Sequence, residues 1–216
     1  MILLDRRRYM ERADNIPYQR IAYLQYKTIA NKPNSQFIDC LYIPDGTEVF
    51  DIDFNINVQP NSSSEFSLLF GARLVAQGTH QANFWTGFNS SLSTMIRFGT
   101  VNPSSSFSIS QGVNYHATID LPNRLYTIGS NSLSFANSDI IPVERSIYLF
   151  NVNTPTAALN RSGEYRISSF KITKNNNAIL DFIPVRINST GYMYDKVSGQ
   201  LFGNSGTDTF ALGPDV

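Results

Sequence analysis

Two aspartates and a glutamate stand close together in the stretch "EVFDIDFNINV", and closely spaced carboxyl groups are what a glycosidase uses. Apolar and polar residues alternate from Phe50 to Val58, which predicts a half-buried strand with Asp51 and Asp53 on its polar face and Glu48 just before it. Retaining glycosidases place two carboxyl groups about 5–5.5 Å apart. The in-strand pair here is two aspartates, and asparagines follow on the same face. We therefore interpret this face as a solvated outer face and predict no catalytic residue and no enzymatic activity.

Metal and cofactor chemistry finds little support in the residue spacing. Asp51 and Asp53, with loop carbonyls, could offer oxygen ligands to calcium, but their spacing resembles no calcium-binding loop. His80 and His116 are far apart and lack cysteine or carboxylate companions at metal-site spacing. The chain has neither a "GxSxG" nucleophile turn nor a phosphate-binding glycine loop. We predict no cofactor and no metal.

Aromatic and basic residues offer a different chemistry, the binding of sugars. Trp85, the only tryptophan, lies in "NFWTGF", and an exposed indole can stack on the apolar face of a sugar ring. A buried position in the core is the favoured interpretation of Trp85, and sugar stacking is the alternative. The candidate glycan-binding residues are Trp85, Tyr115, Arg73 and Arg97.

The N-terminal segment has a charge opposite to that of the remainder. Residues 1–32 hold seven Arg or Lys against three acidic residues, a net charge of +4, so the rest carries −4 because the whole chain is neutral. A helix over Asp5–Ala13 is the only helix candidate, and arginines in its first turn would oppose the helix dipole. Three arginines are too few for strong nucleic-acid binding. We predict that residues 1–20 form an anchoring arm that docks on an acidic or apolar protein surface through Leu3, Leu4, Arg6, Arg7, Arg8, Tyr9 and Met10.

The composition is that of a sheet protein with an ample core. Hydrophobic residues make up 42%, with 15 Phe and 11 Tyr, whereas charged residues make up only 16%. Cys40 is the only cysteine, so no disulfide within the chain is expected. The apolar start is too short for a signal peptide, and no apolar run is long enough to insert into a membrane. We expect a soluble chain that is made in a cytoplasm.

Short alternating stretches separated by turn residues predict many strands and one domain over residues 21–216. "KNNN" at Lys174–Asn177 predicts a hairpin turn, since asparagine tolerates the left-handed backbone region. The other predicted strands are Phe66–Leu74, Ala82–Phe88, Thr94–Gly99, Phe107–Ser110, Asn114–Leu121, Leu125–Gly129, Ser132–Phe135, Ser146–Val152, Glu164–Ile172 and Ala178–Ile183.

Motifs spread along residues 20–216 resemble one family of sheet domains. They include "LFGAR" at Leu69–Arg73, "IYLFNVN" at Ile147–Asn153 and "DFIPVR" at Asp181–Arg186. In this order they resemble the LamG-like, concanavalin A-like jelly-roll domains of bacteriophage virion proteins and gut-bacterial surface proteins. The resemblance implies an all-β antiparallel jelly-roll sandwich. Further matching stretches are Ala22–Gln25, Ser35–Cys40, Ile167–Ile172, Tyr192–Val197, Asn204–Phe210 and Gly213–Pro214.

The turn-rich C-terminus is predicted to close the sheet. "DFIPV" should be a strand that ends at Pro184 and Arg186, and short ribbons should follow it. These should place Tyr194, Phe202 and Phe210 against the core and lay the final strand beside the first, which leaves fewer unpaired edge groups.

The resemblance implies a bacteriophage virion structural protein, a head, neck or tail decoration held by its N-terminal arm to other virion proteins. The start "LDRRRYM" also resembles the openings of phage structural proteins. The alternative is a carbohydrate-binding module or adhesin that recognises host-surface glycans, and a glycoside hydrolase is the third possibility. We expect a homo-oligomer, with a trimer favoured.

Overall fold

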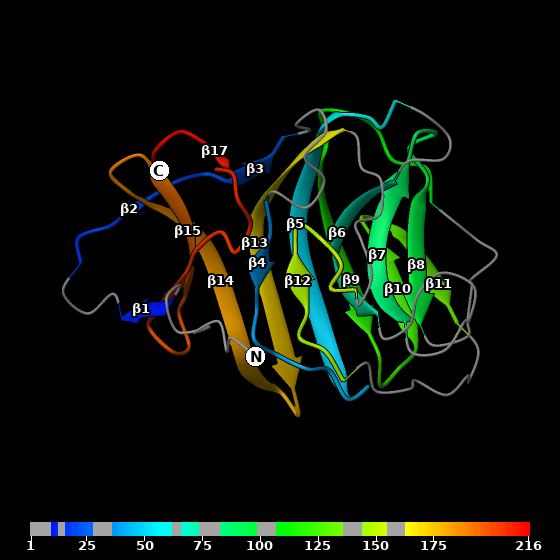
Figure 1. Ribbon diagram of the computed structural model, residues 1–216. Helices are drawn as coiled ribbons and strands as arrows, with labels where there is room; N and C mark the ends of the chain where they lie inside the picture. Colours follow the sequence, from blue (N-terminus) through cyan, green and yellow to red (C-terminus); the bar gives the residue numbers. More distant parts are fainter. Residues whose placement is uncertain are drawn as a thin grey trace.

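The computed structural model describes residues 10–12, 16–27, 36–61, 66–73, 83–98, 107–135, 144–154 and 163–216. These residues form two sheets of antiparallel strand pairs, one of twelve strands and one of five, stacked as a sandwich (Figure 1). The described part of the chain has no helix, so it has none that could cross a membrane. The predicted all-β sandwich is confirmed.

The large sheet runs in the order β1-β16-β15-β14-β13-β5-β9-β10-β11, with β3, β17 and β2 attached beside β13 and β14. The small sheet runs in the order β4-β12-β6-β7-β8. The strands of the large sheet are β1 Met10–Arg12, β2 Gln19–Arg20, β3 Leu24–Tyr26, β5 Glu48–Val58, β9 Asn114–Asp120, β10 Leu125–Ile128, β11 Asn131–Ser134, β13 Glu164–Lys174, β14 Asn177–Ile187, β15 Thr190–Asp195, β16 Gln200–Phe202 and β17 Ala211–Leu212. Those of the small sheet are β4 Ile38–Asp39, β6 Phe66–Arg73, β7 Asn83–Asn89, β8 Thr94–Phe98 and β12 Tyr148–Leu149.

Strand β5 confirms the alternating pattern that predicted it. Phe50, Ile52 and Phe54 point into the core and are at most 2% exposed. Asp51 and Asp53 alternate with them and therefore face outward from the large sheet. The alternation fails toward the C-terminal end of the strand, where Asn55 is buried and Val58 is 41% exposed, the reverse of what their places in the pattern predict.

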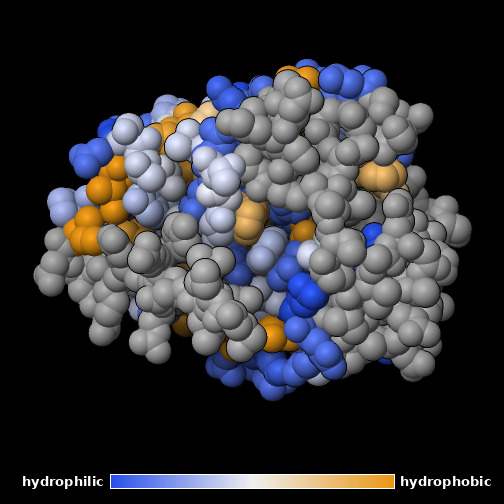
Figure 2. All heavy atoms as spheres, viewed as in Figure 1, coloured by the Kyte–Doolittle hydropathy of each residue, from blue (hydrophilic) through white to orange (hydrophobic). Residues whose placement is uncertain are grey.

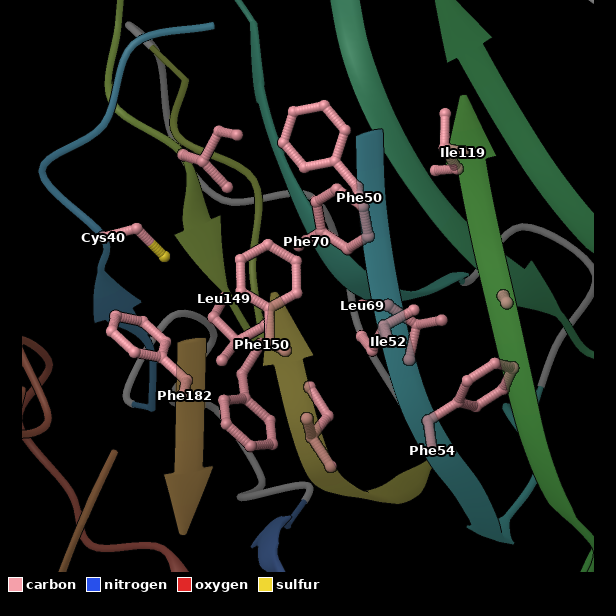
Figure 3. Close-up of a cluster of buried hydrophobic side chains, with 14 of the residues drawn as sticks. Cys40, Phe50, Ile52, Phe54, Leu69, Phe70, Ile119, Leu149, Phe150 and Phe182 are labelled. Atoms are coloured by element: carbon pink, nitrogen blue, oxygen red, sulfur yellow. The ribbon is translucent and has the colours of Figure 1, made fainter. Parts of the chain in front are cut away.

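Aromatic rings fill the space between the two sheets (Figure 3). Phe50 of β5 meets Phe70 of β6 at a centroid distance of 5.6 Å, and Phe70 meets Phe170 of β13 at 4.9 Å. Phe182 of β14 and Phe150 extend the same cluster. Rings from both sheets thus interlock in one core, which holds the two sheets together.

Tyr165 and Cys40 place polar groups inside this core in two different ways. The buried Tyr165 hydroxyl lies 2.5 Å from the carbonyl oxygen of Leu68 and 2.9 Å from that of Phe150. The Cys40 side chain points toward the phenyl rings in Figure 3, and burial raises the pKa of its thiol well above the ordinary value. Cys40 therefore behaves as a small apolar residue.

The β13–β14 hairpin turns at Asn175 and Asn176, as predicted. Their φ angles are 50° and 62°, the left-handed values that a two-residue type I′ turn requires, and Lys174 pairs with Asn177 across the turn. The turn sets the register of two eleven-residue strands at the centre of the large sheet.

The C-terminus closes the sheet beside its first strands, also as predicted. β17 pairs with β3, and the amides of Ala22 and Val216 donate to the carbonyls of Pro214 and Arg20 at 2.8 and 3.1 Å. Phe202 and Phe210 are buried as expected.

Two details of the predicted C-terminus are wrong. Tyr194 is half-buried and packs against Tyr18, with ring centroids 4.8 Å apart. Met193 is the core residue of β15, because it pairs with the inward-facing Phe202.

Strand β14 also continues through Pro184 to Ile187. Pro184 pairs with Met193 of β15, and on its other side its carbonyl accepts from the Ile21 amide at 3.1 Å. Proline is accommodated on that other side because the β13 pairing ends at Phe182 and the β2 pairing begins at Val185.

Two other predicted strands are much shorter in the structure. Phe107–Ser110 forms only an isolated bridge, Ser108 with Ser93. Ser146–Val152 is reduced to β12, because Phe150 adopts a φ of 64° that ends the extended backbone.

Of the predicted arm, the structure describes Met10–Arg12 and residues 16–20. Met10–Arg12 is strand β1, paired with β16 at the edge of the large sheet, so the helix expected over Asp5–Ala13 is wrong at these positions. β2, at the end of the arm segment, pairs with β14. The candidate docking residues Leu3, Leu4, Arg6, Arg7, Arg8 and Tyr9 lie outside the described residues, as does the side chain of Met10.

Candidate functional site

The outer face of the large sheet is hollowed where β9, β5, β13 and β14 run side by side. One hollow of about 850 Å³ lies over Asp51, Lys171 and Asp181, and a second of about 580 Å³ lies over Asn114 and Arg166. The two hollows adjoin, and we call them together the sheet-face groove. The residues that line both are Ala22, Asp53, His116 and Ser168.

Asp53 is the centre of a hydrogen-bonded cluster in this groove. Its Oδ1 lies 2.7 Å from Nδ1 of His116, and its Oδ2 accepts a hydrogen bond from the Ser169 hydroxyl. Ser168 also reaches the groove, because a register shift between Ile167 and Ser169 breaks the strict alternation of β13. The cluster presents a carboxylate, an imidazole and two hydroxyls to solvent.

Asp51 and His116 are also neighbours, although no carboxylate stands at metal-site spacing from His116 in the sequence. Asp51 accepts a hydrogen bond of 2.7 Å from Thr118, and His116 Nε2 lies 3.6 Å from Asp51 Oδ1. Asp51 and Asp53 lie near His116 because β5 pairs with β9, with Asp53 directly opposite His116. His80 lies outside the described residues.

No group of three or more His, Cys, Asp and Glu side chains in the described part of the chain is arranged to hold a metal ion. Asp51 and Asp53 face hydroxyl and imidazole groups of neighbouring strands rather than the loop carbonyls that a calcium site would need.

At the other end of the groove, Arg166 of β13 is held in one orientation. Its Nε donates to Oε1 of Gln25 at 2.9 Å, and its Nη2 donates to Oδ1 of Asn57 at 3.0 Å. The guanidinium carbon lies 4.5 Å from the centre of the Tyr23 ring, a cation–π contact. Glu164 accepts from the amide nitrogens of both Gln25 and Asn57, at 2.9 and 3.0 Å.

The structure separates the four candidate glycan-binding residues between the two sheets. Arg73 ends β6, Trp85 lies in β7 and Arg97 in β8, all in the small sheet, where Trp85 is the cross-strand partner of Arg97. The side chains of Trp85 and Arg97 lie outside the described part. Burial lowers the pKa of Arg73, and its Nε is buried without an acceptor.

Tyr115, the fourth candidate, lies in β9 of the large sheet. Its ring packs against Phe54 at a centroid distance of 5.8 Å, and its hydroxyl accepts a hydrogen bond of 2.8 Å from the Ser110 amide. Tyr115 is therefore mainly a packing residue at the rim of the core that also borders the groove.

The sequence prediction missed the groove residues Arg166, Gln25 and Ser169. The only available signal was the polar spacing in "EYRISS", where Glu164, Arg166 and Ser168 alternate with apolar residues. That signal marks an outward face, but it does not show which strand lies beside it.

Comparison with known proteins gives no family for this chain. No protein-family model matches it, and no curated protein matches it. Several solved structures have a similar arrangement of strands at 11–15% sequence identity.

Two sialidase-related structures and a peptidase illustrate this distance. A carbohydrate-binding module (CBM40) of Ruminococcus gnavus IT-sialidase bound to α2,3-sialyllactose is 12% identical, with 67% of this chain and 90% of that chain covered and a TM-score of 0.38. A mutant Trypanosoma rangeli sialidase with trans-sialidase activity is 13% identical over 61% of this chain, with a TM-score of 0.45. Scytalido-glutamic peptidase is 15% identical, with 88% and 100% covered and a TM-score of 0.37.

The match spans about a fifth of the length of the T. rangeli sialidase, 21%. The fold follows from the strand pairing itself: the chain is an all-β sandwich of two antiparallel sheets with a polar groove on the outer face of the larger one.

Proposed function

We propose that this chain is a carbohydrate-binding module that holds a glycan in the sheet-face groove. The observation that carries the proposal is the orientation of the polar side chains there: Asp53 is held by His116 and Ser169, and Arg166 by Gln25 and Asn57. Groups that are ordered before binding lose little conformational entropy when a ligand arrives.

The groove also has the mixture of groups that sugar hydroxyls need. A hydroxyl both donates and accepts, so a sugar is bound best where acceptors and donors alternate. Asp51 and Asp53 supply acceptors, Arg166 and Lys171 supply donors, and Ser168 supplies both. The size of the hollows, about 850 and 580 Å³, lies within the range of ligand sites in proteins.

The proposal is binding without turnover. Both oxygens of Asp53 are engaged, by His116 and by Ser169, and Asp51 accepts from Thr118. A pair of carboxylates held by neighbouring donors is suited to accept hydrogen bonds from the hydroxyls of a ligand. A glycosidase instead needs one carboxyl group that keeps its proton at working pH and delivers it to the leaving group.

A glycan array with the wild-type chain and its variants tests the proposal. We expect His116→Ala and Lys171→Ala to weaken binding about tenfold each, because each removes one hydrogen bond to the ligand. Ser132→Ala, an exposed position on β11 of the same sheet, is the matched control and should bind like the wild type. Trp85→Ala asks whether the small sheet contributes instead.

Absence of binding to any glycan at millimolar concentration would overturn the proposal. So would loss of binding in Trp85→Ala with unchanged binding in His116→Ala, which would move the site to the small sheet.

We further propose that the module is displayed on a bacteriophage particle as a homo-oligomeric adhesin, attached to other virion proteins through its N-terminal segment. Two observations favour this setting, the +4 charge of residues 1–32 and the sequence resemblance of Asp181–Pro214 to phage jelly-roll domains. Deletion of Met1–Tyr9 should abolish incorporation of the chain into the particle.

A further inference from the structure

Arg166 stands in the groove with one edge of its guanidinium group unused. A guanidinium has five N–H groups in a fixed planar fork. The described contacts engage Nε and one proton of Nη2, through Gln25 and Asn57. The protons of Nη1 and the second proton of Nη2 therefore have no acceptor in the described contacts. These two nitrogens form the edge of the guanidinium that can bind a carboxylate through two parallel hydrogen bonds.

Arg166 has no direct ion-pair partner among the described residues. Its side chain is half-buried. Gln25 and Asn57, which accept its two hydrogen bonds, are neutral amides. A partly desolvated cation with neutral acceptors gains more from an anionic ligand than a solvated surface arginine does.

Glu164 explains why those amides present their oxygens to Arg166. Its Oε2 accepts from Nε2 of Gln25 and from Nδ2 of Asn57, so each amide nitrogen points to Glu164 and each amide oxygen points to the guanidinium. Glu164 is a positioning residue: it orients the neutral acceptors without contacting Arg166 directly.

From this geometry we infer that the preferred ligand of the groove is an acidic sugar, and that Arg166 binds its carboxylate through the Nη1–Nη2 edge. The inference rests on the proposed glycan-binding function and makes it more specific. The sugar ring then extends from Arg166 toward Asp53, His116 and Ser168, which line both hollows and can bond its hydroxyls.

The test is isothermal titration of the full chain with matched ligands: 3′-sialyllactose against lactose, and glucuronic acid against glucose. We expect the acidic member of at least one pair to bind about tenfold or more tightly than the neutral member. Arg166→Gln should bring that ratio close to one. Arg166→Lys, which keeps the charge but loses the fork, should restore only part of the preference.

Arg124→Gln is the matched control, because it removes an arginine from the turn between β9 and β10, outside the groove. It should leave the acidic preference unchanged. Arg20→Gln, at the other end of the groove, tests whether that arginine takes the carboxylate instead. Each variant that is scored should keep the wild-type melting temperature. Glu164→Gln should lower the acidic-to-neutral ratio more than it lowers the affinity for the neutral sugar, which a purely structural role would not do.

Four results would overturn the inference. Equal binding of acidic and neutral sugars would do so while leaving the glycan-binding function intact, whereas binding of neither would remove both. Retention of the acidic preference in Arg166→Gln, with its loss in Arg20→Gln, would place the carboxylate elsewhere. Tighter binding of a sulfated lactose than of sialyllactose, dependent on Arg166, would assign the edge to a tetrahedral anion.

Discussion

Glu48 is a charged residue at a fully buried position, 0% exposed at the start of β5. Its Oε1 accepts hydrogen bonds from the Tyr42 hydroxyl at 2.6 Å and from the Asp45 amide at 2.8 Å, and its Oε2 accepts from the Gly46 amide at 2.9 Å. Burial and, after it, the hydrogen bond to Glu48 raise the pKa of Tyr42 well above the ordinary value. Glu48 thus holds the loop before β5 in place and takes no part in the groove.

Replacing Glu48 with alanine should destabilise the fold. The change leaves one hydroxyl and two amides without an acceptor, so we expect the free energy of unfolding to fall by about 3 kcal/mol. Urea denaturation measures this loss. Glu48→Gln keeps an oxygen acceptor and should lose less, and a Glu48→Ala chain as stable as the wild type would contradict the assigned role.

Two features of strand β13 decide which of its side chains face the groove. The turn at Asn175–Asn176 aligns β13 with β14, and the register shift between Ile167 and Ser169 brings two consecutive serines to the same face. A one-residue slip of this hairpin would reverse the faces and bury the groove side chains.

Substitution of Asn176 by valine should destabilise this hairpin. Asn176 has a φ of 62°, a region that a β-branched residue adopts only with strain. We expect a loss of about 1–2 kcal/mol in the free energy of unfolding. Asn176→Gly should be neutral or slightly stabilising, because glycine adopts this φ without penalty. Comparable stability of the two variants would show that the turn does not constrain the sheet.

At the scale of the whole molecule, strands from near both ends of the described chain join the large sheet. β17 pairs with β3, and β1 pairs with β16 (Figure 1). On the face seen in Figure 2, hydrophilic residues predominate along the lower edge, and apolar residues gather at the left end, where Figure 1 places β2 and β15. β1 pairs with β16 and therefore occupies a backbone edge of this sheet that would otherwise be open.

Two N-terminal deletions separate anchoring from folding. Removing Met1–Tyr9 leaves β1 in place, so the melting temperature should stay within about 1–2 °C of the wild-type value while incorporation into a particle is lost. Removing Met1–Asn15 also removes β1 and uncovers the edge of β16, which should lower the melting temperature and promote self-association. Normal incorporation of the shorter deletion would contradict the anchoring role.

The sequence by itself determined where most strands lie and which face of each is apolar. The alternation in Phe50–Val58, the asparagine turn before β14 and the closing C-terminal strand were all predictable, because each depends on residues adjacent in the chain. Predictions failed where a distant contact decided the outcome. Pro184 continues a strand because β13 does not pair beside it, and Tyr194 faces outward because Met193 pairs with Phe202.

Only the tertiary structure determined which side chains come together in the groove. Asp53 meets His116 across 63 residues of sequence and Ser169 across 116, and Arg166 meets Gln25 across 141. The local periodicity predicts that these side chains point outward, but it does not predict the strand order or the register. Those follow from the packing of the whole core, which is why one carboxylate, one imidazole and one guanidinium from separate strands share a single surface.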